Sequence, residues 1–133
     1  TSPMDLLDRD LVEYEWIGFG DGDPNWKAWF ASVGIDAANL RPIAHFSDEI
    51  MCIEAAIDNR AIALVSVIAA SREIERGRIA APVPNVLKDR SYYLVCPLER
   101  AESAKVRAFQ DWLLTEADQF RESPYGQRVM PQV

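Results

Sequence analysis

The stretch from Phe46 to Gly77 (FSDEIMCIEAAIDNRAIALVSVIAASREIERG) constrains the fold most, because it predicts a helix, a buried strand and a second helix in succession. Its first part has apolar side chains at helical spacing, with Ser47 as the expected N-cap and acidic residues in the first turn. The continuous apolar run Ala61–Val65 is typical of a strand covered on both faces. The ends of such strands, and the starts of the helices that follow them, are where open α/β sheets bind ligands.

The rest of the chain continues this alternation of strands and helices. Alternating apolar and polar residues predict a strand over 11–19, and an aromatic stripe predicts a core-packed helix over 24–33 with Asp23 as its N-cap. The sequence further predicts strands over 41–46, 78–81 and 91–96, helices over 68–76 and 103–120, and a tail over 121–133. Together these elements predict an α/β fold, with a mainly parallel sheet and helices on both of its faces.

Length and charge limit the function. With 133 residues, the chain forms one domain or one lobe of a larger one. Its formal net charge of −7 argues against direct DNA or RNA binding, which needs clustered Lys and Arg. No apolar run is long enough to span a bilayer and the first residues lack the pattern of a signal peptide, so we expect a cytoplasmic protein. Cys52 and Cys96 lie in apolar contexts and are expected to be buried free thiols.

Motifs of enzymes and metal sites are weak in this sequence. The segment GFGDGD over 18–23 is expected to be a loop, because its two acids would repel phosphate and it lacks the further oxygen ligands of a calcium loop. His45 has no orienting motif around it, so a structural role is expected. The chain lacks a nucleophile elbow, a metal-ligand cluster and a convincing acid–base pair. We therefore predict that it is not an enzyme and needs no cofactor or metal.

Ordered motifs along residues 1–120 resemble a known family. They are WKAWFASVGID, FSDEIMCIEAAIDNRAIALV, an ERGRI turn and SYYLVCPLERAESAKVRAFQDWLL. This string resembles the effector-binding (substrate-binding) domain of LysR-type transcriptional regulators. It is similar to the branch that contains the glycine-cleavage activator and the β-lactamase inducer regulators. The family usually has Gly-x-Gly between the central helix and strand, whereas this chain has Asn59-Arg60-Ala61, where Asn59 is expected to adopt the positive φ that the turn requires.

The resemblance implies a three-layer α/β/α lobe like that of type 2 periplasmic binding proteins, with a mixed, mostly parallel sheet, as part of a two-lobed effector domain. Residues 11–91 would form mainly the second lobe, residues 92–120 the return strand and C-terminal helix, and residues 121–133 a tail. A small metabolite would bind in the cleft between the lobes. Promoter DNA would be bound only by an N-terminal helix-turn-helix domain that is missing here, and a homodimer or homotetramer is expected.

The resemblance also marks candidate effector-binding residues. Matching positions that face the cleft are Gly18, Phe19, Ser47, Asp48, Ser66 and Tyr92. Free amides at the start of the helix beside Ser47 could hold a carboxylate, although Asp48 would oppose an anion. These candidates also have a purely structural interpretation. Ser47 and Ser66 would then serve as helix caps without binding a ligand, and Phe19 and Tyr92 would pack against other side chains.

A solute-binding protein fragment of a transport system shares this fold and is the alternative function. No export signal is visible, and free cysteines suit the cytoplasm, so the regulatory module is favoured.

Overall fold

The computed structural model describes residues 1–15, 23–87 and 92–129, and it describes residues 128 and 129 by their backbone alone. The chain separates into two compact units, Thr1–Leu87 and Lys88–Val133. Each unit is described by itself below.

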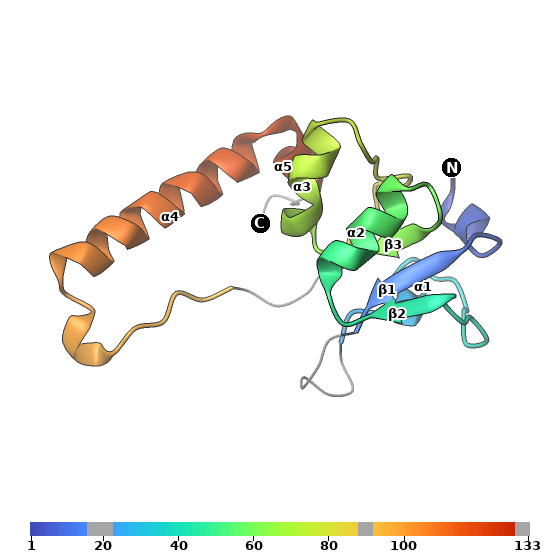
Figure 1. Cartoon of the computed structure of the whole chain (residues 1–133), viewed down its shortest axis with the longest axis horizontal. Helices are drawn as coiled ribbons and strands as arrows, with labels where there is room; N and C mark the ends of the chain where they lie inside the picture. Colours follow the sequence, from blue (N-terminus) through green and yellow to red (C-terminus); the bar gives the residue numbers. More distant parts are fainter. Residues whose placement is uncertain (16–22, 88–91, 130–133) are drawn as a thin grey trace. The chain divides into compact units, whose positions relative to one another are not determined.

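A parallel sheet lies at the centre of the first unit (Figure 1). It has three strands in the order β2-β1-β3, where β1 is Leu11–Tyr14, β2 is Ala44–Phe46 and β3 is Ile62–Leu64. In register, Val12 of β1 lies opposite Ala44 of β2 and Ala63 of β3. The parallel pairing that the alternation of elements predicted is therefore confirmed. The strand predicted over 78–81 is absent from the described part of the chain.

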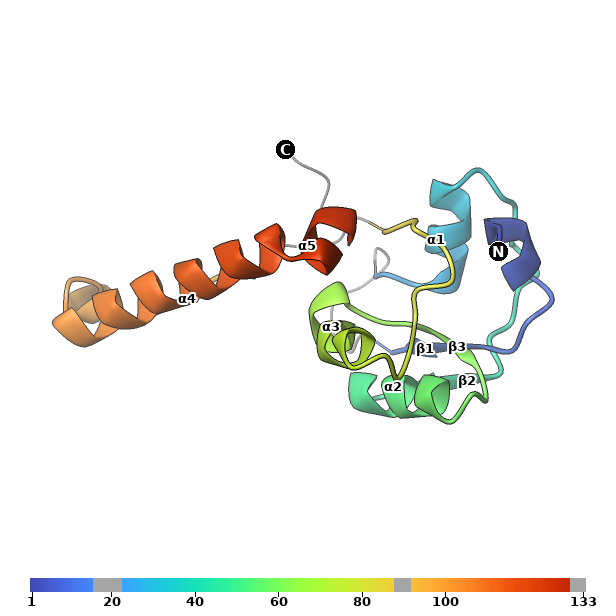
Figure 2. The same cartoon turned by 90° about the horizontal axis from the view of Figure 1, so that it is seen from above.

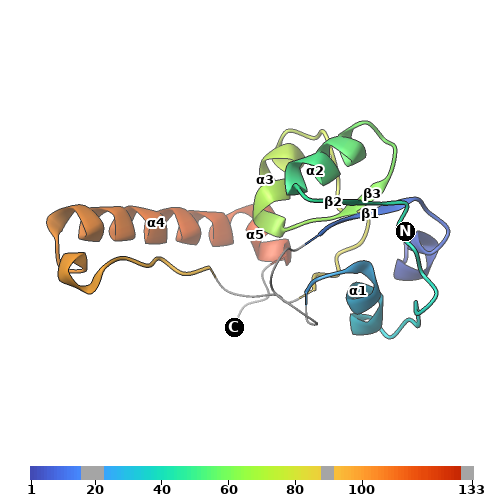
Figure 3. The ribbon, with the colours of Figure 1, turned by 60° about the horizontal axis from the view of Figure 1, so that its bottom comes forward.

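Helices cover both faces of this sheet. The helix α1 (Trp26–Ser32) lies on one side, and α2 (Glu49–Ile57) and α3 (Val67–Glu75) lie on the other, as two views agree (Figures 2 and 3). Because side chains alternate along a strand, β1 presents Leu11 and Glu13 to α1 and turns Val12 toward α2. The unit thus has the three α/β/α layers expected from the sequence.

The main core lies between α1 and the sheet. Trp26, Trp29 and Phe30 of α1 are each at most 3% exposed and pack against Leu11 and against Leu6 of the short 3-10 helix Pro3–Leu6. The ring centroids of Trp29 and Phe30 lie 5.1 Å apart in an edge-to-face arrangement, one of the geometries that aromatic pairs prefer. Burying one such side chain contributes about 1.5–3 kcal/mol. The prediction that the aromatic stripe belongs to the core is confirmed.

The helix caps differ by one or two residues from those predicted. Asn25, not Asp23, caps α1 by accepting from the Ala28 amide, so this helix begins after Pro24 rather than at it. Asp48, not Ser47, caps α2. In both cases two cap-forming residues lie one or two positions apart, and sequence alone does not decide between them. The prediction for Asn59 is confirmed, since its φ of 55° places it in the left-handed region after α2.

In its described residues, the second unit contains an extended segment, a 3-10 helix and two α-helices. Residues 92–97 form no strand within the described chain, contrary to the strand predicted over 91–96, because strand propensity does not supply a pairing partner. The 3-10 helix Leu98–Arg100 is followed by α4 (Ala104–Glu122) and α5 (Pro124–Val129). The tail predicted over 121–133 is therefore wrong for the residues of α5.

Candidate functional site

The carboxyl ends of the parallel strands identify one edge of the sheet as the candidate site. Each strand of the first unit is followed along the chain by a helix, so the N-termini of α1, α2 and α3 gather at this edge (Figure 2). Such an edge is where α/β sheets commonly bind ligands. The polar groups at the three helix starts therefore decide what the edge can recognise.

Ser66 at the start of α3 is held by its own helix and by α2. Its hydroxyl oxygen accepts from the Ala69 amide at 3.2 Å, which makes Ser66 the N-cap of α3. The same hydroxyl donates to Glu49 Oε2 at 3.2 Å, and the Ser66 amide donates to the other carboxylate oxygen of Glu49. Glu49 is the first residue of α2, so this carboxylate joins the starts of two helices. The helix-capping role that was the alternative to ligand binding for Ser66 is therefore observed.

The start of α2 is occupied by its own side chain. The Asp48 carboxylate accepts from the Ile50 amide at 2.8 Å, while Ser47 is exposed immediately before it. The free amides expected at this end are therefore partly taken up by Asp48. A ligand here meets a capped helix start and the exposed hydroxyl of Ser47.

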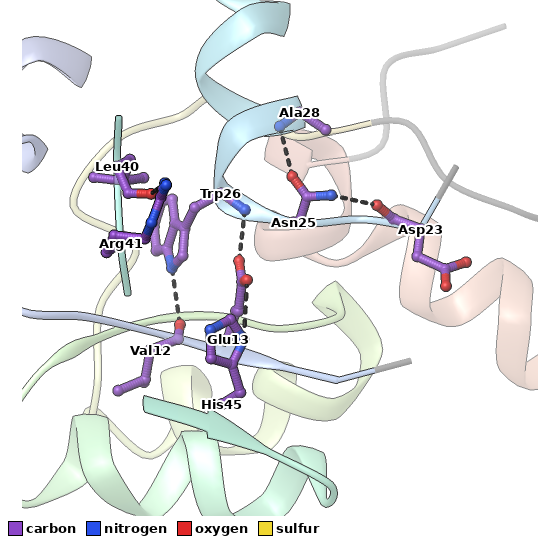
Figure 4. A network of polar contacts seen from close by, with 9 residues as sticks. All are labelled: Val12, Glu13, Asp23, Asn25, Trp26, Ala28, Leu40, Arg41 and His45. Carbon is purple, nitrogen blue, oxygen red and sulfur yellow. Dashed lines mark hydrogen bonds and ion pairs between the residues drawn. The ribbon is translucent and has the colours of Figure 1, made fainter. Parts of the chain in front are cut away.

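The start of α1 is tied to the sheet by Glu13 (Figure 4). The Trp26 amide donates to Glu13 Oε2 at 2.7 Å, and the Trp26 indole N–H donates to the Val12 carbonyl at 2.8 Å. His45 Nδ1 lies 3.2 Å from Glu13 Oε1. Glu13 is only 8% exposed, so its charge is buried together with these partners. The structural role predicted for His45 is consistent with this pairing.

All three helix starts thus hold a carboxylate of the chain itself. Glu13 accepts from the first amide of α1, Asp48 caps α2, and Glu49 accepts from the N-cap amide of α3. Negative groups are favourable there because they complement the helix dipole. The edge therefore presents hydrogen-bond acceptors as well as hydroxyl groups. Sequence reasoning missed Glu13 and Glu49, although an acid in the first helical turn was a readable signal for Glu49.

The predicted site residues are only partly brought together. Asp48 and Ser66 lie at helix starts that Glu49 connects, and Ser47 precedes the first of them. Tyr92 belongs to the second unit, where it is 75% exposed. Gly18 and Phe19 lie outside the described residues.

The two cysteines have different surroundings. Cys52 is fully buried, and this burial, with the nearby Glu49 and Asp48 carboxylates, raises the pKa of its thiol to about 11. Cys96 is exposed, so the prediction of a buried thiol is wrong for this residue. Among the residues that the structure places, no three His, Cys, Asp or Glu side chains gather as a metal site would require. Within the described ranges, no helix has the length and hydropathy needed to cross a bilayer.

Comparison with known proteins decides the family. The family model of the LysR substrate binding domain matches residues 5–118. The chain belongs to this family. Its LysR relatives include the glycine cleavage system transcriptional activator of Escherichia coli K12, which is 34% identical over 94 residues that make up 70% of this chain and 31% of the relative. The regulator BlaA of Proteus vulgaris is 30% identical over 119 residues, which cover 86% of this chain and 37% of the relative.

A solved structure supports the same assignment. The effector domain of the transcriptional regulator AmpR of Pseudomonas aeruginosa matches with a TM-score of 0.67 and 27% sequence identity. The match covers 90% of this chain and 54% of the AmpR chain. The expected LysR effector-domain fold is therefore confirmed. The chain spans about a third of the length of the curated relatives.

Proposed function

We propose that this chain senses a small metabolite for a LysR-type transcriptional regulator, with the edge formed by the starts of α2 and α3 as one wall of the binding cleft. The observation that best supports the proposal is the Glu49–Ser66 contact, which joins these two helix starts at the carboxyl ends of the strands. Ligand binding would shift the balance between arrangements of lobes or subunits, and that shift would regulate transcription.

The wall would contact the ligand through Ser47, Asp48 and Ser66. Gly18 and Phe19 are proposed contacts from the loop after β1, and Tyr92 is a proposed contact from the return segment. The Ser47 hydroxyl can donate or accept, whereas the Asp48 carboxylate and the Ser66 hydroxyl, which already donates its proton to Glu49, can only accept. This set of groups suits a ligand that presents hydrogen-bond donors to the second lobe.

The rest of the effector domain would come from a longer protein. We propose that residues 11–91 form the second lobe and that residues 92–120 return toward a first lobe. The exposed apolar side chains of the second unit support this, because Tyr93 and Val95 are more than 80% exposed and Trp112 of α4 is 53% exposed. A first lobe would cover them. Promoter DNA would be bound by a separate helix-turn-helix domain, in a cytoplasmic homodimer or homotetramer.

The alternative, a solute-binding fragment for transport, is not favoured. The glycine cleavage activator, BlaA and AmpR are all transcriptional regulators. A non-catalytic role is proposed on the same ground.

The test is a thermal-shift screen of the complete two-lobed protein against amino acids, aromatic acids and cell-wall fragments. A compound that raises the melting temperature should lose most of its effect in Ser47→Ala and Asp48→Ala. Ser71→Ala on α3 is the matched control, because the Ser71 hydroxyl donates only to the Ile68 carbonyl of its own helix. If no compound stabilises the protein, or if the control loses the shift equally, the proposal fails.

A further inference from the structure

A small pocket lies in the first unit beside the Glu13–His45 pair, between α1 and the segment that leads into β2. Its volume is about 280 Å³, close to the lower end of the volumes usual for ligand pockets, roughly 300–1,000 Å³. It is lined by Glu13, Asn25, Trp26, Lys27, Leu40, Arg41, Pro42 and His45. The residues proposed above to contact the metabolite are not among them.

Two cations outside any described salt bridge line this pocket. Arg41 is exposed, and its Nη1 donates to the Leu40 carbonyl at 2.8 Å and to the Ala38 carbonyl at 3.4 Å. These neutral acceptors hold the guanidinium group without neutralising it. Lys27 on α1 is also exposed, and no described carboxylate forms an ion pair with either cation. In a chain with a net charge of −7, two cations beside one pocket are a local exception.

The one acid among the lining residues is already engaged by the protein. Glu13 is buried, and its two carboxylate oxygens already face the Trp26 amide at 2.7 Å and His45 Nδ1 at 3.2 Å. Because Nδ1 of His45 faces Glu13, the Nε2 side of the half-exposed ring remains available for a further hydrogen bond. The pocket therefore combines two cations, a histidine and the engaged Glu13 carboxylate with the apolar surfaces of Leu40 and Pro42.

We propose that this pocket binds a small carboxylate of a few carbon atoms. The carboxylate would accept hydrogen bonds from the Arg41 guanidinium and the Lys27 ammonium, which form charge-assisted bonds with such groups. The short hydrocarbon part would lie against Leu40 and Pro42. The residues that line this pocket differ from the metabolite contacts proposed above, and the proposal does not depend on those contacts.

The test uses NMR titration of the 133-residue chain with sodium butyrate, with 1-butanol as the neutral ligand of equal carbon number. Butyrate should cause saturable shifts of the backbone and indole N–H signals of Trp26, which report on the pocket through Glu13 and Val12. Arg41→Gln and Lys27→Gln should each weaken binding by about tenfold. Both residues are exposed, so the variants should fold, and their undisturbed spectra without ligand would show it.

Arg72→Gln is the matched control, because Arg72 is an exposed arginine of α3 that does not line the pocket. It should bind butyrate as the parent chain does, and neither 1-butanol nor sodium chloride should reproduce the shifts. Absence of saturable shifts would overturn the proposal. Equal binding by Arg41→Gln and the parent chain, or identical shifts with chloride, would also overturn it.

Discussion

Glu13 is the residue at which the polar contacts around α1 converge. A buried carboxylate is costly unless its oxygens are paired, and here one oxygen accepts from the Trp26 amide while the other faces His45. The contact therefore fixes the start of α1 to β1 and joins β1 to β2. Nothing in the local sequence reveals this role, because Trp26 lies 13 positions away along the chain.

Replacing Glu13 should destabilise the first unit. Glu13→Ala should lower the free energy of unfolding by about 2 kcal/mol, because the Trp26 amide and His45 lose their acceptor in a buried place. Glu13→Gln should cost less, since its amide oxygen can still accept one hydrogen bond. Urea unfolding followed by tryptophan fluorescence measures both. The exposed neighbour Glu15→Ala should stay within about 0.5 kcal/mol of the parent, and an equal loss there would contradict the role of Glu13.

The two thiols should react at very different rates. Cys96 is exposed, whereas burial raises the pKa of the Cys52 thiol to about 11 and removes it from solvent. Alkylation of the native chain with iodoacetamide at pH 8 should modify one thiol quickly, and Cys96→Ser should abolish that fast phase. A fast phase that persists in Cys96→Ser would show that Cys52 is accessible.

The raised pKa of Cys52 also predicts the direction of a pH effect on stability. The protonated thiol is favoured in the folded state, so its contribution is complete below the ordinary thiol pKa of 9.0 and is lost as pH rises toward about 11. The free energy of unfolding of the parent chain should therefore fall across this range more steeply than that of Cys52→Ala.

At the level of elements, the Glu49–Ser66 contact couples α2 to α3. Two hydrogen bonds join the first residue of α2 to the N-cap of α3, so each helix start depends on the other. Sequence analysis placed a ligand contact at Ser66 and a possible cap there. It had no means of pairing Ser66 with Glu49, because this contact depends on how the helices pack.

A double-mutant cycle should measure this coupling. Glu49→Ala and Ser66→Ala should show an interaction energy of about 1–2 kcal/mol in urea unfolding, as expected for hydrogen bonds to a charged group. Glu54→Ala combined with Ser66→Ala is the control, since Glu54 is an exposed acid of the same helix and should be additive. Additive effects for Glu49 and Ser66 would contradict the link between the helices.

Other elements show where sequence patterns sufficed. The apolar run before Ser66 predicted a strand, which is observed as β3, and Asn59 predicted the left-handed turn, because both depend on local chemistry. That β3 lies at the edge of the sheet with half-buried residues, rather than being buried as predicted, depends on which strands pair. The cap of α2 was misplaced by one residue, since Ser47 and Asp48 both suit the position. The Ser-Pro-Gly composition after α4 predicted a tail, whereas Pro124 lies at the first position of α5, where proline is favourable.

At the scale of the whole chain, the layered fold could be predicted from the sequence. Which predicted strands would find a pairing partner within this chain could not. Alternating strands and helices specify a parallel sheet with two covered faces, and that is observed. The segment after residue 91 has strand propensity, yet pairing needs a neighbouring strand, which the described chain does not offer it. The family match extends to residue 118, and the match with the solved structure covers about half of the AmpR effector domain. We therefore expect the remaining lobe to supply that partner.

Hydrogen–deuterium exchange on the complete regulator, with and without a compound that stabilises it, tests the central claim most directly. Binding at the sheet edge should slow exchange of the amides in the first turns of α2 and α3, over residues 49–51 and 67–69, and leave the first turn of α4 unchanged. Protection confined to other parts of the protein, with these two helix starts exchanging as fast as before, would contradict the account.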